Sequence, residues 1–139
     1  MTFVTGKLVR FAHVDAAGIV FYPRYFEMLN GAVEDWFEGV AGVSMKGLHL
    51  DRRLGIPTVK LDTEFVAPSR LGDMLQFHMD VSKLGRSSIE FVVDIRCGAE
   101  TRFRVRSVLV CIDLDAHRSV PWPEDMRPAM EVAAAAVAA

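Results

Sequence analysis

The chain has 139 residues, of which 51% are hydrophobic and 24% are charged, and its formal net charge is −2. This balance is typical of a folded globular protein and excludes a disordered chain. The slightly negative charge gives no basis for binding nucleic acid, and no apolar run reaches the roughly 18 residues that a membrane span requires. We therefore expect a single domain over residues 1–139, without nucleic-acid or membrane partners.

The two cysteines, Cys97 and Cys111, lie in apolar, strand-like runs. Neither belongs to a CxxC pair or stands at a zinc-ligand spacing from a histidine, so we expect reduced, buried thiols and no metal site. The N-terminus lacks the basic, apolar and small-residue succession of a secretory signal peptide. These features predict a cytoplasmic protein.

The first predicted element is a strand over residues 3–11, which is rich in β-branched and aromatic residues. A glycine-containing loop follows it. A long amphipathic helix is predicted from Pro23, because proline is favoured at the first helical position, and Gly39 and Gly42 are suited to the helix end. Its apolar residues recur at steps of three and four: Phe26, Leu29, Val33, Trp36, Phe37 and Val40.

The rest of the chain is dominated by strand-like runs. Residues 44–54 can form a short helix, and turn residues then separate runs whose connections are short enough for hairpins. The runs cover residues 56–66, 74–84, 87–97 and 102–114. The last segment, 126–139, is helix-competent, but it carries too little apolar surface to pack firmly, so we predict a frayed or disordered tail.

This order of elements predicts an α+β fold in which an antiparallel sheet of about five strands wraps one long central helix. A single sheet of this size covers only one side of so apolar a helix. We therefore expect a homo-oligomer, in which a second subunit extends the sheet and helps to satisfy both the edge strands and the ligand cleft.

The most informative segment is HVDAAGIVFYPRYFEML, residues 13–29. It places Asp15 in a loop that continues through Tyr22 into the start of the long helix. At a helix start, unpaired backbone N–H groups and the helix dipole favour negative charge, including charge that develops on a substrate oxygen. The arrangement suits acyl-transfer chemistry, although the spacing alone favours a merely loop-forming aspartate.

Residues 15–23, DAAGIVFYP, followed by RYF, resemble the D-x-A-G-I-V-x-Y-P loop of the hot-dog-fold acyl-CoA thioesterases, specifically the 4-hydroxybenzoyl-CoA thioesterase family. The resemblance covers roughly residues 5–125. It implies the hot-dog fold and hydrolysis of a coenzyme A thioester between the subunits of an oligomer, either a dimer or a dimer of dimers. Coenzyme A enters as part of the substrate, so no separate cofactor is expected.

The resemblance also implies roles for individual residues. Asp15 matches the catalytic carboxylate, as nucleophile or general base, and the Tyr22 backbone N–H matches the group that polarises the thioester carbonyl. Gly18 belongs to the same motif, whereas Ala16 departs from the proline that many relatives have after the acid. The positions that look like those binding the nucleotide end of coenzyme A are Arg86, Ser88 and Arg118.

Three further residues are candidates for the same cleft. His13 can orient Asp15 or simply face solvent, and Thr63, in the strand after the helix, can reach the cleft. Its neighbour Glu64 is the obvious rival for the catalytic role, because it is a carboxylate from another element. With Arg86, Ser88 and Arg118, the candidate substrate-binding residues are His13, Gly18 and Thr63.

The leading prediction is a thioesterase that hydrolyses an aryl- or medium-size acyl-coenzyme A. Two other functions stay open. A hydratase or dehydratase of acyl thioesters needs an acid and base pair, and His13 with Asp15 is the only nearby pair. A non-catalytic acyl-CoA-binding domain would keep the cleft without turnover, and the intact Asp15, Gly18 and Tyr22 argue against it.

Overall fold

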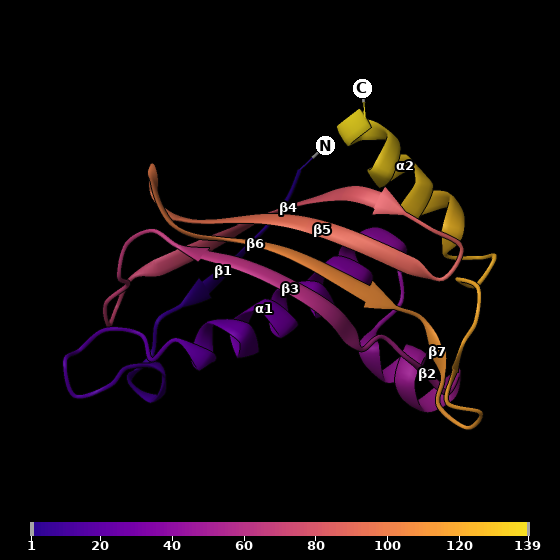
Figure 1. Ribbon diagram of the computed structural model, residues 1–139, viewed down its shortest axis with the longest axis horizontal. Helices are drawn as coiled ribbons and strands as arrows, with labels where there is room; N and C mark the ends of the chain where they lie inside the picture. Colours follow the sequence, from indigo (N-terminus) through magenta and orange to yellow (C-terminus); the bar gives the residue numbers. More distant parts are fainter. Residues whose placement is uncertain (1, 139) are drawn as a thin grey trace.

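The computed structural model describes residues 2–138, and its main elements follow the predicted order (Figure 1). A five-stranded antiparallel sheet with the strand order β1-β4-β5-β6-β3 curves around the long helix α1, Pro23–Trp36. This confirms the predicted α+β architecture. The strands of the sheet are β1 (Phe3–Leu8), β3 (Thr58–Phe65), β4 (Met74–Leu84), β5 (Ser88–Cys97) and β6 (Glu100–Val110).

Helix α1 begins at Pro23, as the sequence predicts, and continues into the π-helical segment η2, Phe37–Ala41. Gly42 ends it with a φ of 74°, a left-handed conformation that glycine adopts without steric cost. No helix in residues 2–138 has both the length and the apolar character needed to cross a membrane. The buried face of α1 comprises Tyr25, Met28, Leu29, Ala32, Val33 and Trp36.

The first and the last predicted strands end earlier in the structure than the sequence predicts. The first ends at Leu8, two residues before the chain turns into the short helix at Phe11–His13. The last breaks at Cys111, where the chain leaves the main sheet for a second, three-stranded sheet with the order β2-β7-β8. The remaining short elements are η1 (Phe11–His13), η3 (Gly47–Asp51), β2 (Leu54–Gly55), β7 (Ile112–Asp113) and β8 (Arg118–Ser119).

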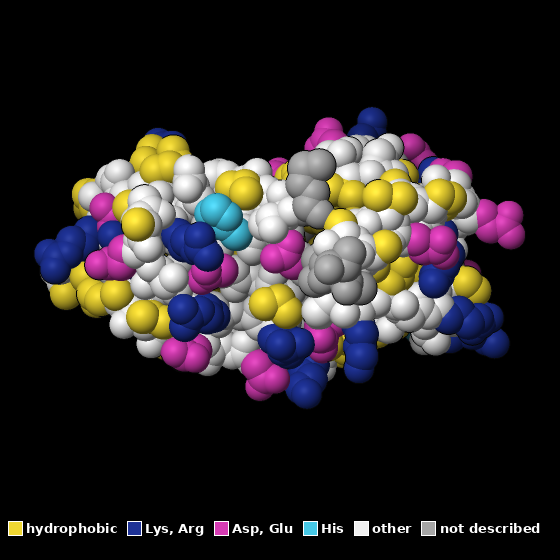
Figure 2. Space-filling model, turned by 90° about the horizontal axis from the view of Figure 1, so that it is seen from above, with side chains coloured by type: hydrophobic (Ala, Val, Ile, Leu, Met, Phe, Trp, Pro, Cys, Tyr) yellow, Lys and Arg dark blue, Asp and Glu magenta, His cyan; other side chains and the backbone are white. Residues whose placement is uncertain are grey.

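The sheet has one apolar and one polar face. On the polar face, ion pairs link Arg96 to Asp94 at 2.6 Å and Arg106 to Glu90 at 2.7 Å. Figure 2 shows acidic and basic side chains interleaved over one side of the molecule. Alternation along the strands puts the apolar side chains on the opposite face, toward α1.

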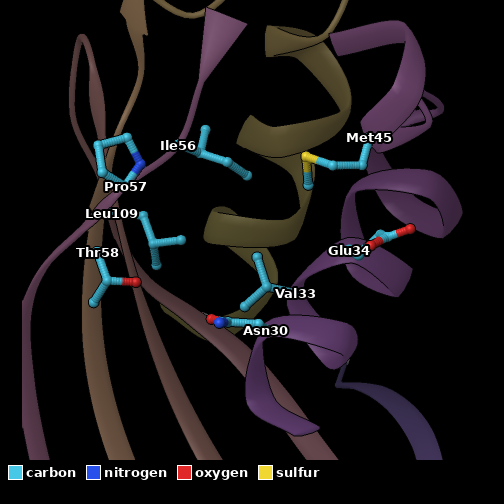
Figure 3. A pocket seen from close by; sticks show the side chains of 8 residues that line it. All are labelled: Asn30, Val33, Glu34, Met45, Ile56, Pro57, Thr58 and Leu109. Atoms are coloured by element: carbon cyan, nitrogen blue, oxygen red, sulfur yellow. The ribbon is translucent and has the colours of Figure 1, made fainter. Parts of the chain in front are cut away.

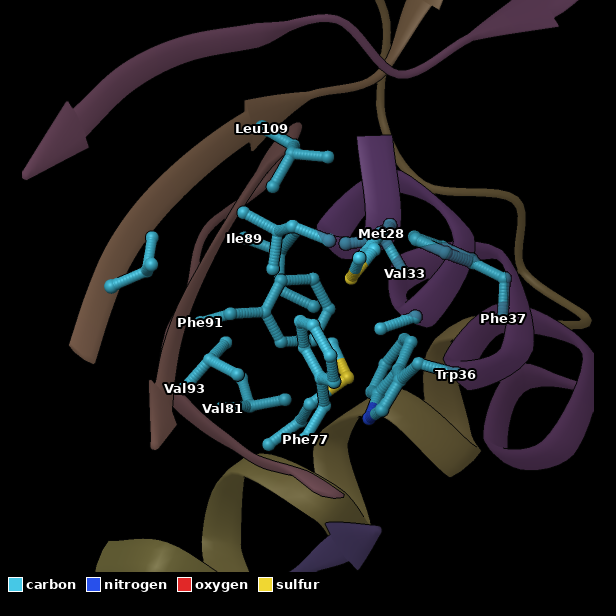
Figure 4. Packing of buried hydrophobic residues seen from close by; sticks show 14 of the residues in the cluster. Met28, Val33, Trp36, Phe37, Phe77, Val81, Ile89, Phe91, Val93 and Leu109 are labelled. Carbon is cyan, nitrogen blue, oxygen red and sulfur yellow. The ribbon is translucent and has the colours of Figure 1, made fainter. Parts of the chain in front are cut away.

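The apolar face packs on α1 in a single core (Figure 4). The Trp36 ring lies edge-on to Phe37 and to Phe91, at centroid distances of 5.0 and 4.9 Å. Phe77 and Phe103 from β4 and β6 are also fully buried. Such aromatic pairs add about 0.5–1.5 kcal/mol each beyond area burial, so the core holds α1 firmly against the sheet.

The C-terminal segment corrects a prediction. Instead of a frayed tail over residues 126–139, the structure has helix α2, Arg127–Ala138, while residue 139 lies outside the described part. Met126 and Met130 are fully buried, and α2 packs along β4 and η2. Two well-placed methionines supply the apolar surface that the alanine-rich sequence lacks on average.

Candidate active site

The loop that carries Asp15 is a tight hairpin. Val14 pairs with Val20, and within the hairpin the Asp15 N–H donates to the Ile19 carbonyl at 2.9 Å. The Gly18 N–H donates to the Asp15 carbonyl at 3.0 Å, and Gly18 has a φ of 77°. A turn closed by a left-handed glycine is typical of three-residue hairpin loops. The sequence DAAG thus provides glycine where the backbone requires it.

The hairpin is fastened to the connection between β3 and β4. The Val20 N–H donates to the Ser69 carbonyl at 2.9 Å. The connection is itself held by the carboxylate of Asp73, which accepts from the Arg70 N–H at 2.9 Å and from Arg102 Nη1 at 2.7 Å. The backbone hydrogen bond from Arg70 and the bond from the Arg102 guanidinium lower the pKa of Asp73. The position of the Asp15 hairpin therefore depends on this charged pair.

The side chain of Asp15 is exposed and uses one oxygen within the loop. Its Oδ1 accepts from the Ala17 N–H at 2.8 Å, the local bond by which aspartate stabilises turns. The loop-forming role that the sequence left open is therefore present. Within residues 2–138 its Oδ2 accepts no hydrogen bond, so this oxygen can attack a carbonyl carbon or take a proton from water.

Tyr22 stands directly before α1, at the position where the helix presents unpaired N–H groups. Its carbonyl accepts from the Tyr25 N–H at 3.2 Å, but its own N–H donates to no acceptor in the described part of the chain. Pro23 has no N–H. The Tyr22 N–H is therefore a free donor at the positive end of the helix dipole, as an oxyanion-binding group requires.

An apolar pocket of about 270 Å³ adjoins Tyr22. The Tyr22 and Phe65 rings meet edge-on at 6.2 Å and are 60% and 52% exposed. Asp15 does not line the pocket within one protomer. Flat, apolar acyl groups suit such aromatic walls. The lining residues are Ile19, Val20, Tyr22, Tyr25, Phe65, Val66, Ala67 and Pro68.

A second pocket, of about 330 Å³, lies farther along the groove between α1 and β3 (Figure 3). The amide of Asn30 extends into it from α1, and the Thr58 side chain lines the opposite wall. The wall between them is apolar and includes Val33, Ile56 and Leu109. The sequence places Asn30 near the cleft on the helix but gives no partner for it, so the opposite wall with Thr58 could not be predicted. The available signal was Asn30, a polar residue about two helical turns after Tyr22 and hence on the same side of the helix.

His13 is held by the loop rather than by Asp15. Its Nδ1 accepts from the Arg10 N–H at 2.8 Å, and it lines a separate pocket with Lys7 and Glu27, between β1 and α1. Within the described residues, the structure does not join His13 and Asp15 by a hydrogen bond. Nor do any three His, Cys, Asp or Glu side chains of residues 2–138 gather as metal ligands.

Thr63 and Glu64 lie on opposite faces of β3. Thr63 pairs with the buried Val105, so it faces the same side of the sheet as the core. The side chain of Glu64 is 71% exposed and lies 3.7 Å from Arg104 on the other face. Thr63 is therefore on the groove side of the sheet. The carboxylate of Glu64, the rival candidate for the catalytic role, points away from the groove.

The remaining candidates lie at the other end of the molecule. Figure 1 shows the connection between β4 and β5, and strand β7, at the end of the sheet opposite the loop before α1. The Arg86 carbonyl in that connection accepts from the Trp122 N–H at 3.0 Å. The side chains of Arg86 and Arg118 are both exposed. One protomer therefore does not bring these residues to Asp15. They are Arg86, Ser88 and Arg118.

Comparisons with known proteins agree with this architecture. The family model described as the Thioesterase-like superfamily matches residues 9–130. A 1,4-dihydroxy-2-naphthoyl-CoA hydrolase from Synechocystis is 24% identical over 131 residues, which cover 93% of this chain and 94% of the relative.

Two solved structures are also similar. The crystal structure of a 1,4-dihydroxy-2-naphthoyl-CoA thioesterase from Synechocystis superposes with a TM-score of 0.83 at 23% identity, covering 94% of this chain and 96% of the other. A Staphylococcus aureus protein solved in complex with CoA superposes with a TM-score of 0.88 at 13% identity, covering 97% and 85%. With a family match over most of its length and this shared architecture, the chain belongs to the Thioesterase-like superfamily and has the predicted hot-dog fold.

Proposed function

We propose that this thioesterase hydrolyses an aryl- or medium-size acyl-coenzyme A to the free acid and coenzyme A. The observation that carries the proposal is the Asp15 hairpin, which leaves one carboxylate oxygen free and leads into the unpaired Tyr22 N–H at the start of α1. A relative that hydrolyses a naphthoyl-CoA, and a similar structure that holds CoA, support this class of substrate.

The chemistry needs a donor for the developing oxyanion and a group that attacks or activates water. The Tyr22 N–H donates to the thioester carbonyl oxygen, and a single donor of this kind contributes about 3 kcal/mol to lowering the barrier. Asp15 either attacks the carbonyl carbon, forming a mixed anhydride and expelling the coenzyme A thiolate, or removes a proton from the attacking water. In the first route, water then hydrolyses the anhydride and frees the carboxylate.

The acyl group is proposed to occupy the pocket beside Tyr22. Its walls are apolar and aromatic, and its volume of about 270 Å³ suits a flat ring or a medium-size chain. The coenzyme A part of the substrate is then left outside this pocket. No separate cofactor takes part, and we propose a cytoplasmic enzyme without a nucleic-acid partner.

We also propose a homo-oligomer, either a dimer or a dimer of dimers. The residues expected to bind the nucleotide lie at the end of the protomer opposite Asp15. A second subunit that runs in the opposite direction brings its nucleotide-binding end to the Asp15 end of the first. The candidates supplied by that second subunit are Arg86, Ser88 and Arg118.

The test is thiol release from benzoyl-, phenylacetyl- and straight-chain coenzyme A esters. Asp15→Asn keeps an oxygen that accepts from the Ala17 N–H, so the loop is retained while the charge is lost. We expect kcat/KM on the best substrate to fall by about 10² or more. The control is Asp51→Asn, at an exposed acid that ends η3, which should leave the rate unchanged.

Two outcomes would overturn the proposal. If Asp15→Asn keeps the wild-type kcat/KM, Asp15 is not the catalytic carboxylate. If the wild type adds water to an enoyl-coenzyme A, or binds acyl-coenzyme A tightly, and releases no thiol from any ester, the protein is not a thioesterase.

A further inference from the structure

A buried tryptophan holds the turn between β4 and β5, residues 85–88, to the core. The Trp122 backbone N–H donates to the Arg86 carbonyl at 3.0 Å, and the indole Nε1–H donates to the Ser88 carbonyl at 3.0 Å. The Trp122 side chain is 2% exposed, and its ring lies 5.9 Å from that of Phe37 between centroids. Because the ring is packed in the core, its residue fixes the turn at two points.

An arginine at the start of α2 holds a third carbonyl of the same turn. Arg127 Nη1 donates to the Gly85 carbonyl at 2.9 Å, and Arg127 Nε donates to Glu131 at 2.8 Å. Figure 1 shows the start of α2 beside the connection between β4 and β5. The turn is also closely packed within itself, because a Cβ at Gly85 would lie only 2.5 Å from Ser88 Oγ.

The turn is further joined to the short strands β7 and β8, which carry Arg118. The Cys111 N–H, directly before β7, donates to the Ser87 carbonyl at 2.7 Å, and Trp122 follows soon after β8. Both ends of the β7–β8 segment are therefore hydrogen-bonded to the turn. Arg86 and Arg118, the two exposed arginines expected to bind the nucleotide, thus lie on parts of the chain that are bonded to each other.

These bonds also orient the free donors of the turn. In a trans peptide unit, the N–H points away from the carbonyl of the preceding residue. The Arg86 N–H is therefore directed away from Arg127, and the Ser87 N–H is directed away from Trp122. Neither N–H donates to an acceptor within residues 2–138. Backbone N–H groups and an exposed guanidinium are the donors that phosphate oxygens accept from.

We propose that Trp122 and Arg127 are positioning residues for the nucleotide end of coenzyme A. They keep the turn ordered in the free protein, so that less conformational entropy is lost when the nucleotide phosphates bind. The inference rests on the proposed thioesterase activity and on the nucleotide-binding role of Arg86 and Ser88. It adds that the segment after the last strand sets the preference for coenzyme A esters over thioesters that lack the nucleotide.

The test compares one acyl group on coenzyme A and on N-acetylcysteamine, which reproduces the thiol end of coenzyme A without its nucleotide. Trp122→Phe removes the Nε1–H and keeps an aromatic ring in the core, and Arg127→Ala removes the bond to Gly85. We expect each variant to raise KM for the coenzyme A ester about fivefold, as the loss of one hydrogen bond does, with kcat changed less than about twofold. On the N-acetylcysteamine ester, kcat/KM should change less than about twofold.

Two matched controls separate this role from general loosening of the fold. Glu131→Gln removes the charge that pairs with Arg127 Nε but leaves the bond from Nη1 to Gly85, so KM for the coenzyme A ester should not change. Trp36→Phe alters another buried tryptophan that also packs against Phe37 but does not touch the turn. Any effect of Trp36→Phe should be the same on both esters.

Binding of free coenzyme A, measured by calorimetry, gives a result that does not depend on turnover. Because the turn is less ordered in Trp122→Phe and Arg127→Ala, we expect Kd for coenzyme A to rise about fivefold in each variant. The Kd in Glu131→Gln should equal the wild-type value.

The outcomes separate this inference from the proposed activity. Equal losses on the two esters, or an unchanged KM for the coenzyme A ester in both variants, overturn the inference, while an active wild type keeps the proposed function. A wild type that releases no thiol, but whose Kd for coenzyme A rises in both variants, keeps the inference and loses the proposed function. A wild type that neither releases thiol nor binds coenzyme A overturns both.

Discussion

Asp15 uses its two carboxylate oxygens for different purposes. Oδ1 holds the turn by accepting from Ala17, and Oδ2 is the oxygen available for chemistry. The structural and the catalytic interpretations of this aspartate are therefore compatible. The same division explains why Asp15→Asn is the informative substitution: it keeps the turn bond and removes only the charge.

The turn itself gives two substitutions of opposite sign. Gly18→Ala forces a side chain into a left-handed conformation and should lower the free energy of unfolding by about 1–2 kcal/mol. Ala16→Pro rigidifies the first central position of the turn, where proline is favoured. This substitution should raise the free energy of unfolding by about 0.4–1 kcal/mol. Urea denaturation of both variants checks the signs. A destabilised Ala16→Pro protein would contradict this description of the loop.

The sequence predicted the shape of the Asp15 loop better than that of its surroundings. The DAAG segment determines its own turn, so its shape is encoded locally in Asp15 and Gly18. His13 was a weaker candidate because its role depends on one bond, from the Arg10 N–H to Nδ1, that no residue pattern reveals. Thr58 lines a pocket between α1 and β3, and a pocket of this kind arises only when the two elements pack together.

Among the elements, the connection between β3 and β4 depends on charge. The hydrogen bonds from Arg70 and Arg102 lower the pKa of Asp73 below the usual value near 4. The stability that Asp73 contributes is therefore present at neutral pH and is lost as the pH falls through its lowered pKa.

Asp73→Asn keeps the acceptor for the Arg70 N–H but removes the charge. We expect the variant to be less stable than the wild type at pH 7, and the difference to shrink as the pH falls below about 4 and through the lowered pKa, where the folded carboxyl becomes protonated. Urea denaturation from about pH 7 to about pH 2.5 measures this. A difference that stays constant with pH would show that the charge does not hold the connection.

Helix α2 shows where average composition misleads. Its alanine-rich sequence predicted a frayed tail, yet Met130 is fully buried. Met130→Ala should lower the free energy of unfolding by about 2 kcal/mol or more, because it leaves a cavity. Val132→Ala is the matched control, since Val132 is 71% exposed and its loss should cost less than about 0.5 kcal/mol. Equal, small effects would mean that α2 does not contribute to the core.

The long elements were predictable, and the short ones were not. The hydrophobic period and Pro23 predicted α1, and the run over residues 74–84 coincides with β4. The two-residue strands β2, β7 and β8 are too short to show any alternation. They form because the chain leaves the main sheet at Cys111. Tertiary packing, rather than local sequence, determines where the chain leaves the sheet.

At the scale of the whole molecule, the proposed site draws on two subunits. Asp15→Asn and the double variant Arg86→Ala with Arg118→Ala should each be weakly active alone. If the subunits of these variants are mixed by refolding together, about half of the random dimers are hybrids, and each hybrid has one intact site.

The mixture should therefore recover about a quarter of the wild-type thiol-release rate in a twofold-symmetric dimer. Each variant refolded with wild-type subunits serves as the control for assembly. Activity no higher than the mean of the two parent variants would show that Asp15 and the two arginines act within the same subunit.

The buried thiol of Cys111 affects how the enzyme tolerates its own product. Burial raises the pKa of Cys111 to about 11, so at pH 7 about one thiol in ten thousand is ionised. Disulfide exchange proceeds through the thiolate. A thioesterase releases coenzyme A at every turnover and is exposed to coenzyme A disulfide in the same solution. Because Cys111 is almost never ionised, it is protected from forming a mixed disulfide with coenzyme A.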